Sequence, residues 1–286
     1  ARSANIAGES GDNFCTSNPD AVSEFAKNLV ASLQSGLLRH ADRVELWMLD
    51  GGRWCECDRC RALGGPTDRL LDLLARVGGE LAAARRNGAL ARPVELSAPA
   101  YLETLAPPAR MPVLDPAVCS VTFFPYFRCY AHELLDPSCT ELNRRIAAAW
   151  TGWAALAADG GAGGSAGSAP RDRARSGGGL ALGVGEYYNV GIFQSLPLVF
   201  PHVMAADIRA YYRGGARHFT YMHAPTRLLG SWALDHAVLA ELLWHPEANV
   251  DSVVAGFCRR SYPASAARMR TFYADLEHAS ANILAI

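Results

Sequence analysis

The chain has 286 residues, half of them apolar, and its 27 lysines and arginines nearly balance 28 aspartates and glutamates. This length suffices for one large domain or two small ones with a sizeable core. The charge balance argues against a nucleic-acid surface or a polybasic membrane contact. No apolar run reaches the roughly 18–20 residues that a membrane span needs. We therefore expect neither nucleic acid nor membrane as a partner.

Short apolar segments alternate with longer amphipathic ones along the chain, which is typical of parallel βα units. A first apolar piece ends at Phe14–Thr16, and Asn18 then caps a helix that ends at Gly36. A strand is predicted over 44–49, and after a long loop Thr67 caps the second helix.

The same reading predicts a strand-rich middle and a helical end. Further strands are expected over 93–101, 119–126, 180–188 and 218–224. Further helices are expected over 140–156, 201–212, 234–244, 250–262 and from 265 to the end. The pattern therefore indicates an α/β protein in which a helix follows most strands.

We interpret about six strands as part of a closed (β/α)8 TIM-type barrel, incomplete at its N-terminus and followed by C-terminal helices. The opening residues resemble the middle of a domain, so we expect the first two βα units to be missing. The predicted domains are a partial barrel over 1–233 and a helical region over 234–286. The Gly-rich stretch 159–179 is predicted to be a mobile insertion in the barrel.

Polar and aromatic side chains follow the predicted strands at their carboxyl ends, where parallel barrels carry their active sites. Asp50 and Glu186 form a candidate catalytic carboxylate pair. The candidates for substrate binding are Tyr101, Arg128, His132, Tyr187, Tyr188 and His223. Aromatic rings that stack on pyranose rings, together with two carboxylates, indicate a sugar site. Arg128 suits a substrate carboxylate such as that of a uronic acid.

Each of these residues also has a structural interpretation. Asp50 precedes two glycines and is a candidate turn former. Glu186 lies in an apolar strand, where an unpartnered carboxylate is costly, and this favours a functional role. The alternative for Tyr187 and Tyr188 is packing, and for His132 and His223 it is a structural role.

Three of the eight cysteines fall within six residues, in the motif Cys55-Glu56-Cys57-Asp58-Arg59-Cys60. Such spacing lets thiolates converge on a zinc ion, which takes four ligands in a tetrahedron. Cys15, at the end of the first apolar piece, is the natural fourth ligand. An ion held by four thiolates has a structural role, so we expect it to hold the loop after Asp50 rather than to take part in catalysis. The alternatives are a disulfide with a free thiol, or reduced cysteines that bind no ligand.

A second loop places Cys129 and Cys139 on either side of His132. A disulfide and simple burial are both compatible with this spacing, and the sequence does not choose between them.

Four segments carry a family likeness: FCTSNPDAV, LDGGRWCECDRC, RCYAHELLDPSCTELN and LLWHPEANVDSVVAGFCRRSYPASAARMRTFY. Together they resemble the bacterial domain-of-unknown-function family 4838. Its members are similar to glycoside hydrolases of the α-glucuronidase and β-hexosaminidase types. The resemblance implies a (β/α)8 barrel followed by helices, and a tyrosine that Tyr187 or Tyr188 matches. Members have Asn-Asp before the cysteine loop, whereas this chain has Leu49-Asp50.

The leading prediction is a carbohydrate-active protein, a glycoside hydrolase that uses Asp50 and Glu186 on a glycan or polysaccharide. One alternative is a glycan-binding barrel without activity, which the departure at Leu49 favours. Another is a metal-dependent hydrolase in which the cysteine loop and His132 share a catalytic ion. The sequence leaves the cellular compartment open.

Overall fold

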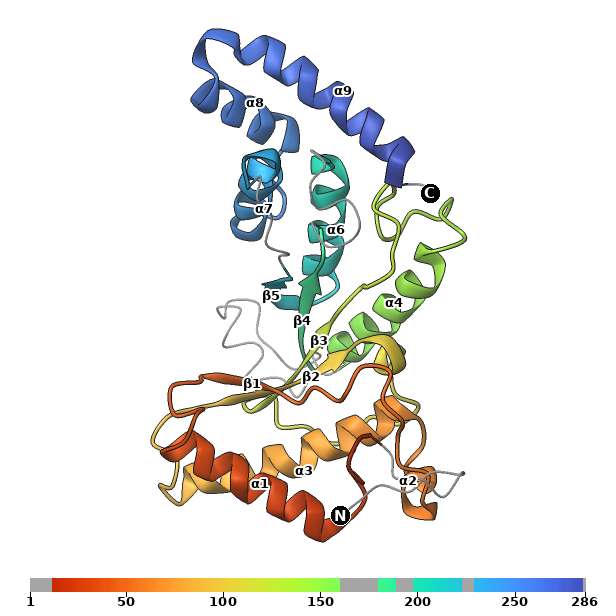
Figure 1. Ribbon diagram of the computed structural model, residues 1–286, viewed down its shortest axis with the longest axis vertical. Coiled ribbons are helices and arrows are strands. Elements are labelled where there is room, and N and C mark those ends of the chain that lie inside the picture. Colours follow the sequence, from red (N-terminus) through yellow and green to blue (C-terminus); the bar gives the residue numbers. More distant parts are fainter. Residues whose placement is uncertain (1–11, 160–179, 189–197, 223–228, 285–286) are drawn as a thin grey trace. The chain divides into compact units, whose positions relative to one another are not determined.

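The computed structural model of the chain describes residues 12–159, 180–188, 198–222 and 229–284 (Figure 1). The chain divides into two compact units. The first comprises Ala1–Phe124 and Gly152–Gly183, and the second comprises Pro125–Thr151 and Val184–Ile286. The Gly-rich stretch predicted as an insertion lies almost wholly outside the described residues, as does His223. None of the described helices has the length and apolar character that crossing a bilayer requires.

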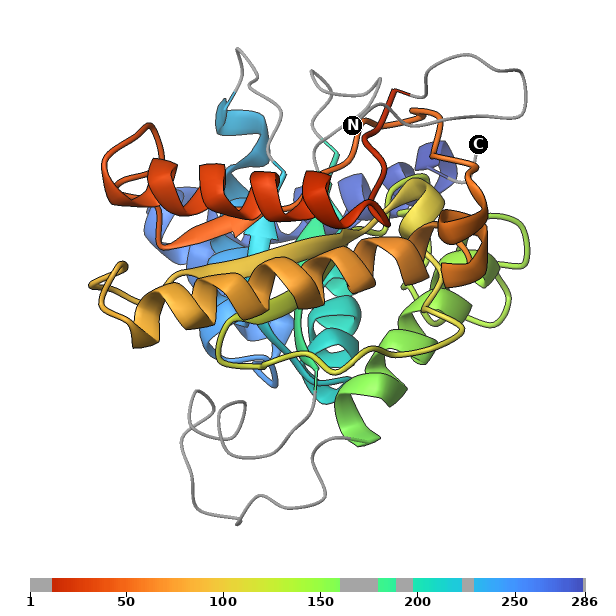
Figure 2. The same ribbon diagram turned by 90° about the horizontal axis from the view of Figure 1, so that it is seen from below.

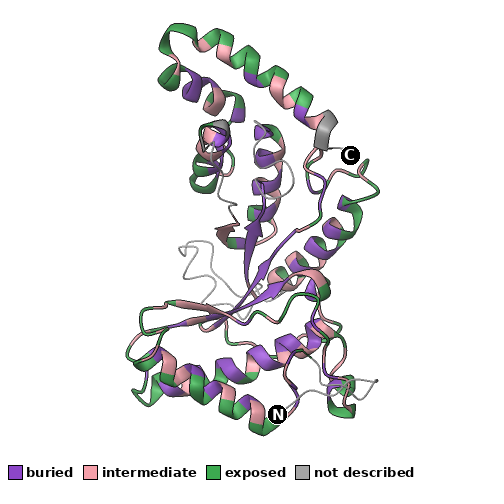
Figure 3. Ribbon diagram, viewed as in Figure 1, coloured by how far each residue is buried: buried purple, intermediate pink, exposed green. Residues whose placement is uncertain are grey.

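Five strands form one parallel sheet in the order β1-β2-β3-β4-β5. The strands are β1 (Arg43–Glu45), β2 (Glu95–Ala100), β3 (Cys119–Phe123), β4 (Ala181–Glu186) and β5 (Ala216–Tyr221). β3 and most of β2 and β4 are buried, as the purple arrows of Figure 3 show. Neighbours in the sheet follow one another in the sequence, and the α/β class predicted from alternating segments is confirmed.

The prediction of a (β/α)8 barrel is wrong, because the described sheet has five strands. The first predicted strand, which ends at Phe14–Thr16, is not a strand in its described part, which ends in a turn at Thr16. The Asn13 side chain there accepts a hydrogen bond from Leu49 N at 2.9 Å, so a side chain takes the place of a strand ladder. The predicted strand 44–49 is also shorter and ends at Glu45, because Trp47–Leu49 leave the ladder with β2.

Two long helices belong to the first unit, α1 (Pro19–Gln34) and α3 (Pro66–Arg86), which contact each other and lie side by side in Figure 2. The predicted cap is confirmed for α1, since Asn18 Oδ1 accepts from Asp20 N and Ala21 N. For α3 the predicted cap is wrong. Gly65 holds that position, and the Thr67 hydroxyl, already inside the helix, donates to Ala106 O at 2.8 Å.

Helix α3 packs on the sheet through its small residues. A Cβ atom on Gly78 would lie 2.3 Å from Cys119 Sγ at the start of β3, so only glycine allows this approach. Polar side chains of the three strands hydrogen-bond to one another: Arg43 Nη2 donates to Ser97 Oγ at 2.9 Å and to Thr122 Oγ1 at 2.6 Å. These contacts satisfy groups that would be costly to bury alone.

The second unit is mainly helical. Its helices after the sheet are α6 (Pro201–Arg213), α7 (Ala233–Trp244), α8 (Val250–Ser261) and α9 (Ala266–Leu284). Each contacts the next in sequence, and all four were predicted. α4 (Asn143–Asp159), also predicted, begins in this unit. The predicted domain boundary at residue 234 stays a prediction.

Candidate metal centre and aromatic edge

Four cysteines of the first unit gather in one cluster able to hold a metal ion. The ligand atoms of Cys15, Cys55, Cys57 and Cys60 all lie within 4.8 Å of one another. Cys15 Sγ is 3.8 Å from Cys57 Sγ and 3.8 Å from Cys60 Sγ. Thiolates about 2.3 Å from a zinc ion, at tetrahedral angles, lie about 3.8 Å apart. The predicted convergence of Cys15 on the cysteine loop is therefore confirmed, and its spacing fits a tetrahedral ion.

The chain brings these cysteines together through two local structures. Cys15 lies in the turn that leads into α1, and Cys60 lies in α2 (Asp58–Leu63), a short helix that the sequence did not predict. Arg69 on α3 fixes the backbone before and after α2, because its guanidinium donates to Cys55 O at 2.9 Å and to Gly64 O at 2.8 Å. The cluster is thus formed by packed elements rather than by the loop alone.

Ser17 is a residue of this centre that the motif did not reveal. Its hydroxyl lies 3.1 Å from Cys60 Sγ, 3.4 Å from Cys15 Sγ and 3.6 Å from Cys57 Sγ. The pKa of the Cys57 thiol is lowered to about 6, first by the Cys60 N–H and further by the Ser17 hydroxyl, against the opposing effect of burial. Such outer hydrogen bonds favour thiolate, the form that binds metal.

The carboxyl edge of β1, β2 and β3 carries an aromatic cluster. Trp47, Tyr101 and Phe124 follow these three parallel strands, so they meet at one edge of the sheet. The Trp47 ring lies 5.4 Å from that of Tyr101 and 4.9 Å from that of Phe124. Phe124 is buried, Tyr101 is partly exposed and Trp47 is 37% exposed. The edge therefore carries a partly exposed indole that packs against two other aromatic rings.

Asp50 lies against this cluster. Trp47 Nε1 donates to Asp50 Oδ1 at 2.7 Å, and Asp50 itself is exposed. Gly51 follows with φ +66°, so the turn that was the structural alternative for Asp50 is present. Asp50 therefore belongs to a turn and also accepts a hydrogen bond from the exposed Trp47 indole.

Two residues near the strand ends adopt the left-handed backbone region that favours glycine. Leu102, with φ 44°, follows Tyr101, and Phe127, with φ 59°, precedes Arg128. Among the residues that the structure describes, no other non-glycine residue has a positive φ. Strain of this kind costs of order 1–3 kcal/mol and gathers at functional sites. Phe127 is also 69% exposed, although it is a large apolar residue.

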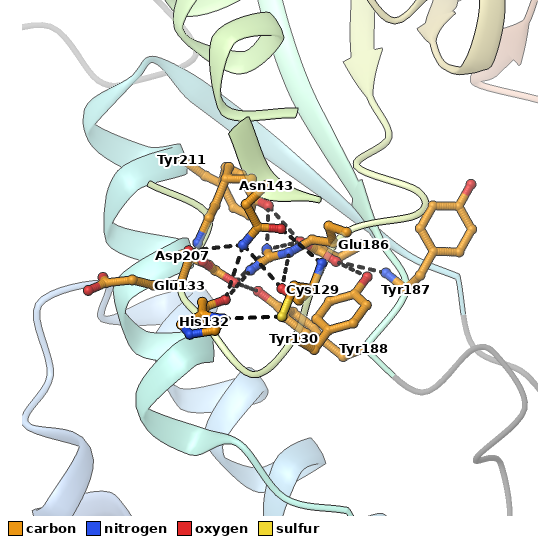
Figure 4. A network of polar contacts seen from close by, with 12 residues as sticks. Cys129, Tyr130, His132, Glu133, Asn143, Glu186, Tyr187, Tyr188, Asp207 and Tyr211 are labelled. Carbon is orange, nitrogen blue, oxygen red and sulfur yellow. Dashed lines mark hydrogen bonds and ion pairs between the residues drawn. The ribbon is translucent and has the colours of Figure 1, made fainter. Parts of the chain in front are cut away.

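Glu186 and Arg128 belong to a buried polar network in the second unit (Figure 4). Arg128 Nη1 lies 3.0 Å from Glu186 Oε1 and 2.7 Å from Asp207 Oδ2, and none of the three side chains has exposed surface. Glu186 Oε1 also accepts from Tyr211 OH at 2.5 Å, and Oε2 accepts from Tyr130 OH at 3.0 Å. Arg128 is therefore the charged partner that the buried Glu186 needs.

The network places one guanidinium between two acids. Burial raises the pKa of Glu186 and of Asp207, and the charge of Arg128 acts against that rise. Burial alone would lower the pKa of Arg128, but Asp207 and the other acidic neighbours hold it well above its ordinary value. The hydroxyls of Tyr130, Tyr188 and Tyr211 donate to the carboxylates and so compensate the second negative charge.

The remaining predicted residues lie around this network. Tyr187 N donates to Glu186 Oε2 at 2.9 Å, and its ring lies 5.0 Å from that of Tyr126. Tyr188 is buried, with its hydroxyl 3.4 Å from Asp207 Oδ2. His132 groups with Cys129 and Cys139. The substrate roles predicted for these residues, and for Arg128, stay predictions.

Sequence reasoning missed Asp207, Tyr211 and Asn143. A signal for the first two exists in α6, where Met204, Asp207, Ile208 and Tyr211 follow the helical i, i+3, i+4, i+7 spacing of a buried face. A carboxylate within such an apolar stripe requires a buried partner. Comparison with protein-family models, curated proteins and solved structures found no match to the chain.

Proposed function

We propose that the protein binds carbohydrate at the carboxyl edge of β1–β3, on the platform formed by Trp47 and Tyr101 and beside Asp50. The single observation that carries this proposal is the exposed indole whose Nε1 donates to Asp50 at 2.7 Å. An aromatic face beside a carboxylate oxygen suits a pyranose ring, which is apolar on its faces and carries hydroxyl groups on its rim.

The cysteine centre supports this edge. We assign to Cys15, Cys55, Cys57 and Cys60 a structural zinc ion, because four thiolates leave no open position for a substrate. Zinc supplies no catalysis in such a site. The chain between Asp50 and Cys55 is only a few residues long, so a fixed Cys55 restricts where Asp50 and its turn can lie.

A panel of immobilised glycans tests the proposal on the full chain with reduced, zinc-loaded cysteines. We expect at least one glycan to be retained by the wild type. Asp50→Asn keeps a hydrogen-bonding oxygen but loses its charge, and it is expected to weaken binding by about 3–10-fold. Failure of every glycan in a broad panel to bind the folded protein would remove the basis of the proposal.

Hydrolysis of a glycosidic bond, with Glu186 as the general acid, is a second candidate function. Burial raises the pKa of Glu186, the direction found in the general acids of glycosidases, and this favours hydrolysis. The complete burial of Glu186 favours binding alone. Turnover of aryl glycosides by the wild type, abolished in folded Glu186→Gln, would support hydrolysis. Retention of glycans without turnover would support binding alone.

A further inference from the structure

A second group of metal-ligating side chains lies in the other unit, in the loop between β3 and α4. Cys129, His132 and Cys139 offer ligand atoms that all lie within 4.8 Å of one another. Cys129 Sγ is 3.3 Å from His132 Nδ1. A thiolate and an imidazole nitrogen on one tetrahedral zinc ion lie about 3.5 Å apart. The two groups therefore already have nearly the separation that a shared ion requires.

The backbone of this loop is fixed by buried polar side chains (Figure 4). Asn143, the first residue of α4, has no exposed surface; its Oδ1 accepts from Cys129 N at 2.8 Å, and its Nδ2 donates to Cys129 O and to Glu133 O, each at 3.2 Å. These bonds hold the peptide groups on both sides of Cys129 and the backbone that follows His132.

The Arg128 network holds the same loop from a second direction. Arg128 Nη2 donates to His132 O at 3.0 Å, and Leu134 N donates to Asp207 Oδ1 at 2.7 Å. Polar groups with no exposed surface thus fix the backbone at and beyond His132. Preorganised ligands of this kind bind a metal without the cost of ordering the loop.

We propose that Cys129 Sγ, His132 Nδ1 and Cys139 Sγ bind a zinc ion, separate from the ion of the four-cysteine centre. Two thiolates and one imidazole are ligands that zinc favours, and three protein ligands leave a fourth tetrahedral position for water or an external ligand. The buried network of Arg128, Asp207 and Asn143 then has a defined role, which is to position the metal-binding loop. This inference does not depend on carbohydrate binding.

Zinc content provides the test. The full chain is purified with reductant, and zinc per chain is measured for the wild type and for Cys139→Ser, which changes a partly exposed thiol. We expect the variant to lose about one ion per chain. Cys258→Ser is the matched control, because Cys258 is a buried cysteine of α8 outside both clusters, and it is expected to keep the wild-type content. Equal zinc content in the wild type and in folded Cys139→Ser would overturn the proposal.

A measurement on the wild type alone covers the case in which the variant does not fold. Alkylation of Cys139, followed by mass spectrometry, is compared in zinc-loaded and chelated protein. We expect zinc to slow modification of Cys139 at least tenfold, and chelation to restore it. A Cys129–Cys139 disulfide in protein that has never met reductant, together with no protection by zinc after reduction, would instead assign the pair as a disulfide and refute the site.

Discussion

The carboxyl group of Asp235 lies in the first turn of α7 with no exposed surface. Oδ1 accepts from Phe200 N at 3.4 Å, while Oδ2 has no hydrogen-bond partner among the described residues. Burial raises the pKa of Asp235 well above its ordinary value. The folded protein therefore keeps this proton at pH values where the unfolded chain has lost it.

The raised pKa of Asp235 makes the free energy of unfolding depend on pH. Unfolding releases the Asp235 proton between the ordinary pKa of about 3.9 and the raised value, so the free energy of unfolding falls as pH rises through this window. Asp235→Asn removes the ionisation, and we expect it to stabilise the protein by about 1–2 kcal/mol at pH 8, with little effect at pH 4. Urea denaturation at both pH values checks this. Asp275→Asn, an exposed change on α9, is the control, and an Asp235→Asn variant no more stable than wild type at pH 8 would contradict the account.

Arg128 lies between two buried carboxylates, and its replacement leaves both without a charged partner among the residues that the structure describes. We expect Arg128→Gln to lower the free energy of unfolding by about 3–5 kcal/mol. Arg213→Gln is a matched control, because Arg213 pairs with Glu247 at the surface at 2.9 Å and such pairs contribute at most about 1 kcal/mol. Similar losses in the two variants, measured by urea denaturation, would show that the buried network does not hold the second unit together.

For single residues, the sequence predicted the cysteine ligands of the metal centre better than the ion-pair partner of Glu186. Cys15 was predicted as the fourth ligand because the spacing of the other three cysteines is a local pattern, and such spacing permits few ways to complete a tetrahedral site. The partner of Glu186 depends on which face of α6 is buried and on the path of the loop after β3. Local patterns do not define that path, so Arg128 was predicted to bind substrate while its internal carboxylate contacts went unnoticed.

At the scale of elements, the contact between α3 and β3 depends on one glycine. A Cβ on Gly78 would lie 2.3 Å from Cys119 Sγ, whereas a Cβ on Gly79 meets nothing within 4 Å. We expect Gly78→Ala to destabilise the protein by about 1–3 kcal/mol through overpacking. Gly79→Ala is expected to stabilise it by about 0.5–1 kcal/mol, because alanine loses less backbone entropy in a helix. Thermal unfolding of both variants checks the pair, and a stabilising Gly78→Ala would contradict the close packing.

The four-cysteine centre makes a prediction about α2. This helix has six residues and is too short to be stable alone, so the proposed ion and the packing of Cys60 must hold it. We expect chelation of zinc to increase amide hydrogen exchange in α2 at least tenfold and to leave α9 unchanged. Exchange measured by mass spectrometry with and without chelator would refute the structural role of the ion if α2 stayed fully protected.

The elements themselves were largely predictable, for physical reasons that differ between them. Helices α1, α6 and α8 have amphipathic faces and local start signals, such as Asn18-Pro19 and Asn249, and these signals act without tertiary contacts. β1 was predicted too long because an apolar run marks burial rather than pairing, and Trp47 leaves the ladder to join an aromatic cluster. No local signal in the sequence distinguishes an apolar run that pairs in a sheet from one that is only buried.

For the whole molecule, counting strands from sequence led to an incorrect fold. Six apolar segments suggested an incomplete eight-stranded barrel, but one segment is a turn and the described sheet has five parallel strands. Sheet closure depends on non-local pairing, which periodicity does not encode. Each of the two compact units contains a cluster of metal ligands, with Cys15, Cys55, Cys57 and Cys60 in the first and Cys129, His132 and Cys139 in the second.

The central claim, that the edge at Trp47 binds carbohydrate, is tested most directly by calorimetric titration of the folded, zinc-loaded protein with the glycan that the panel retains best. The wild type is compared with Trp47→Ala and with Trp244→Ala, which removes a tryptophan that is 85% exposed at the end of α7. We predict that Trp47→Ala weakens binding at least tenfold, which corresponds to about 1.4 kcal/mol, and that Trp244→Ala binds like the wild type. Unchanged affinity in folded Trp47→Ala would contradict the account.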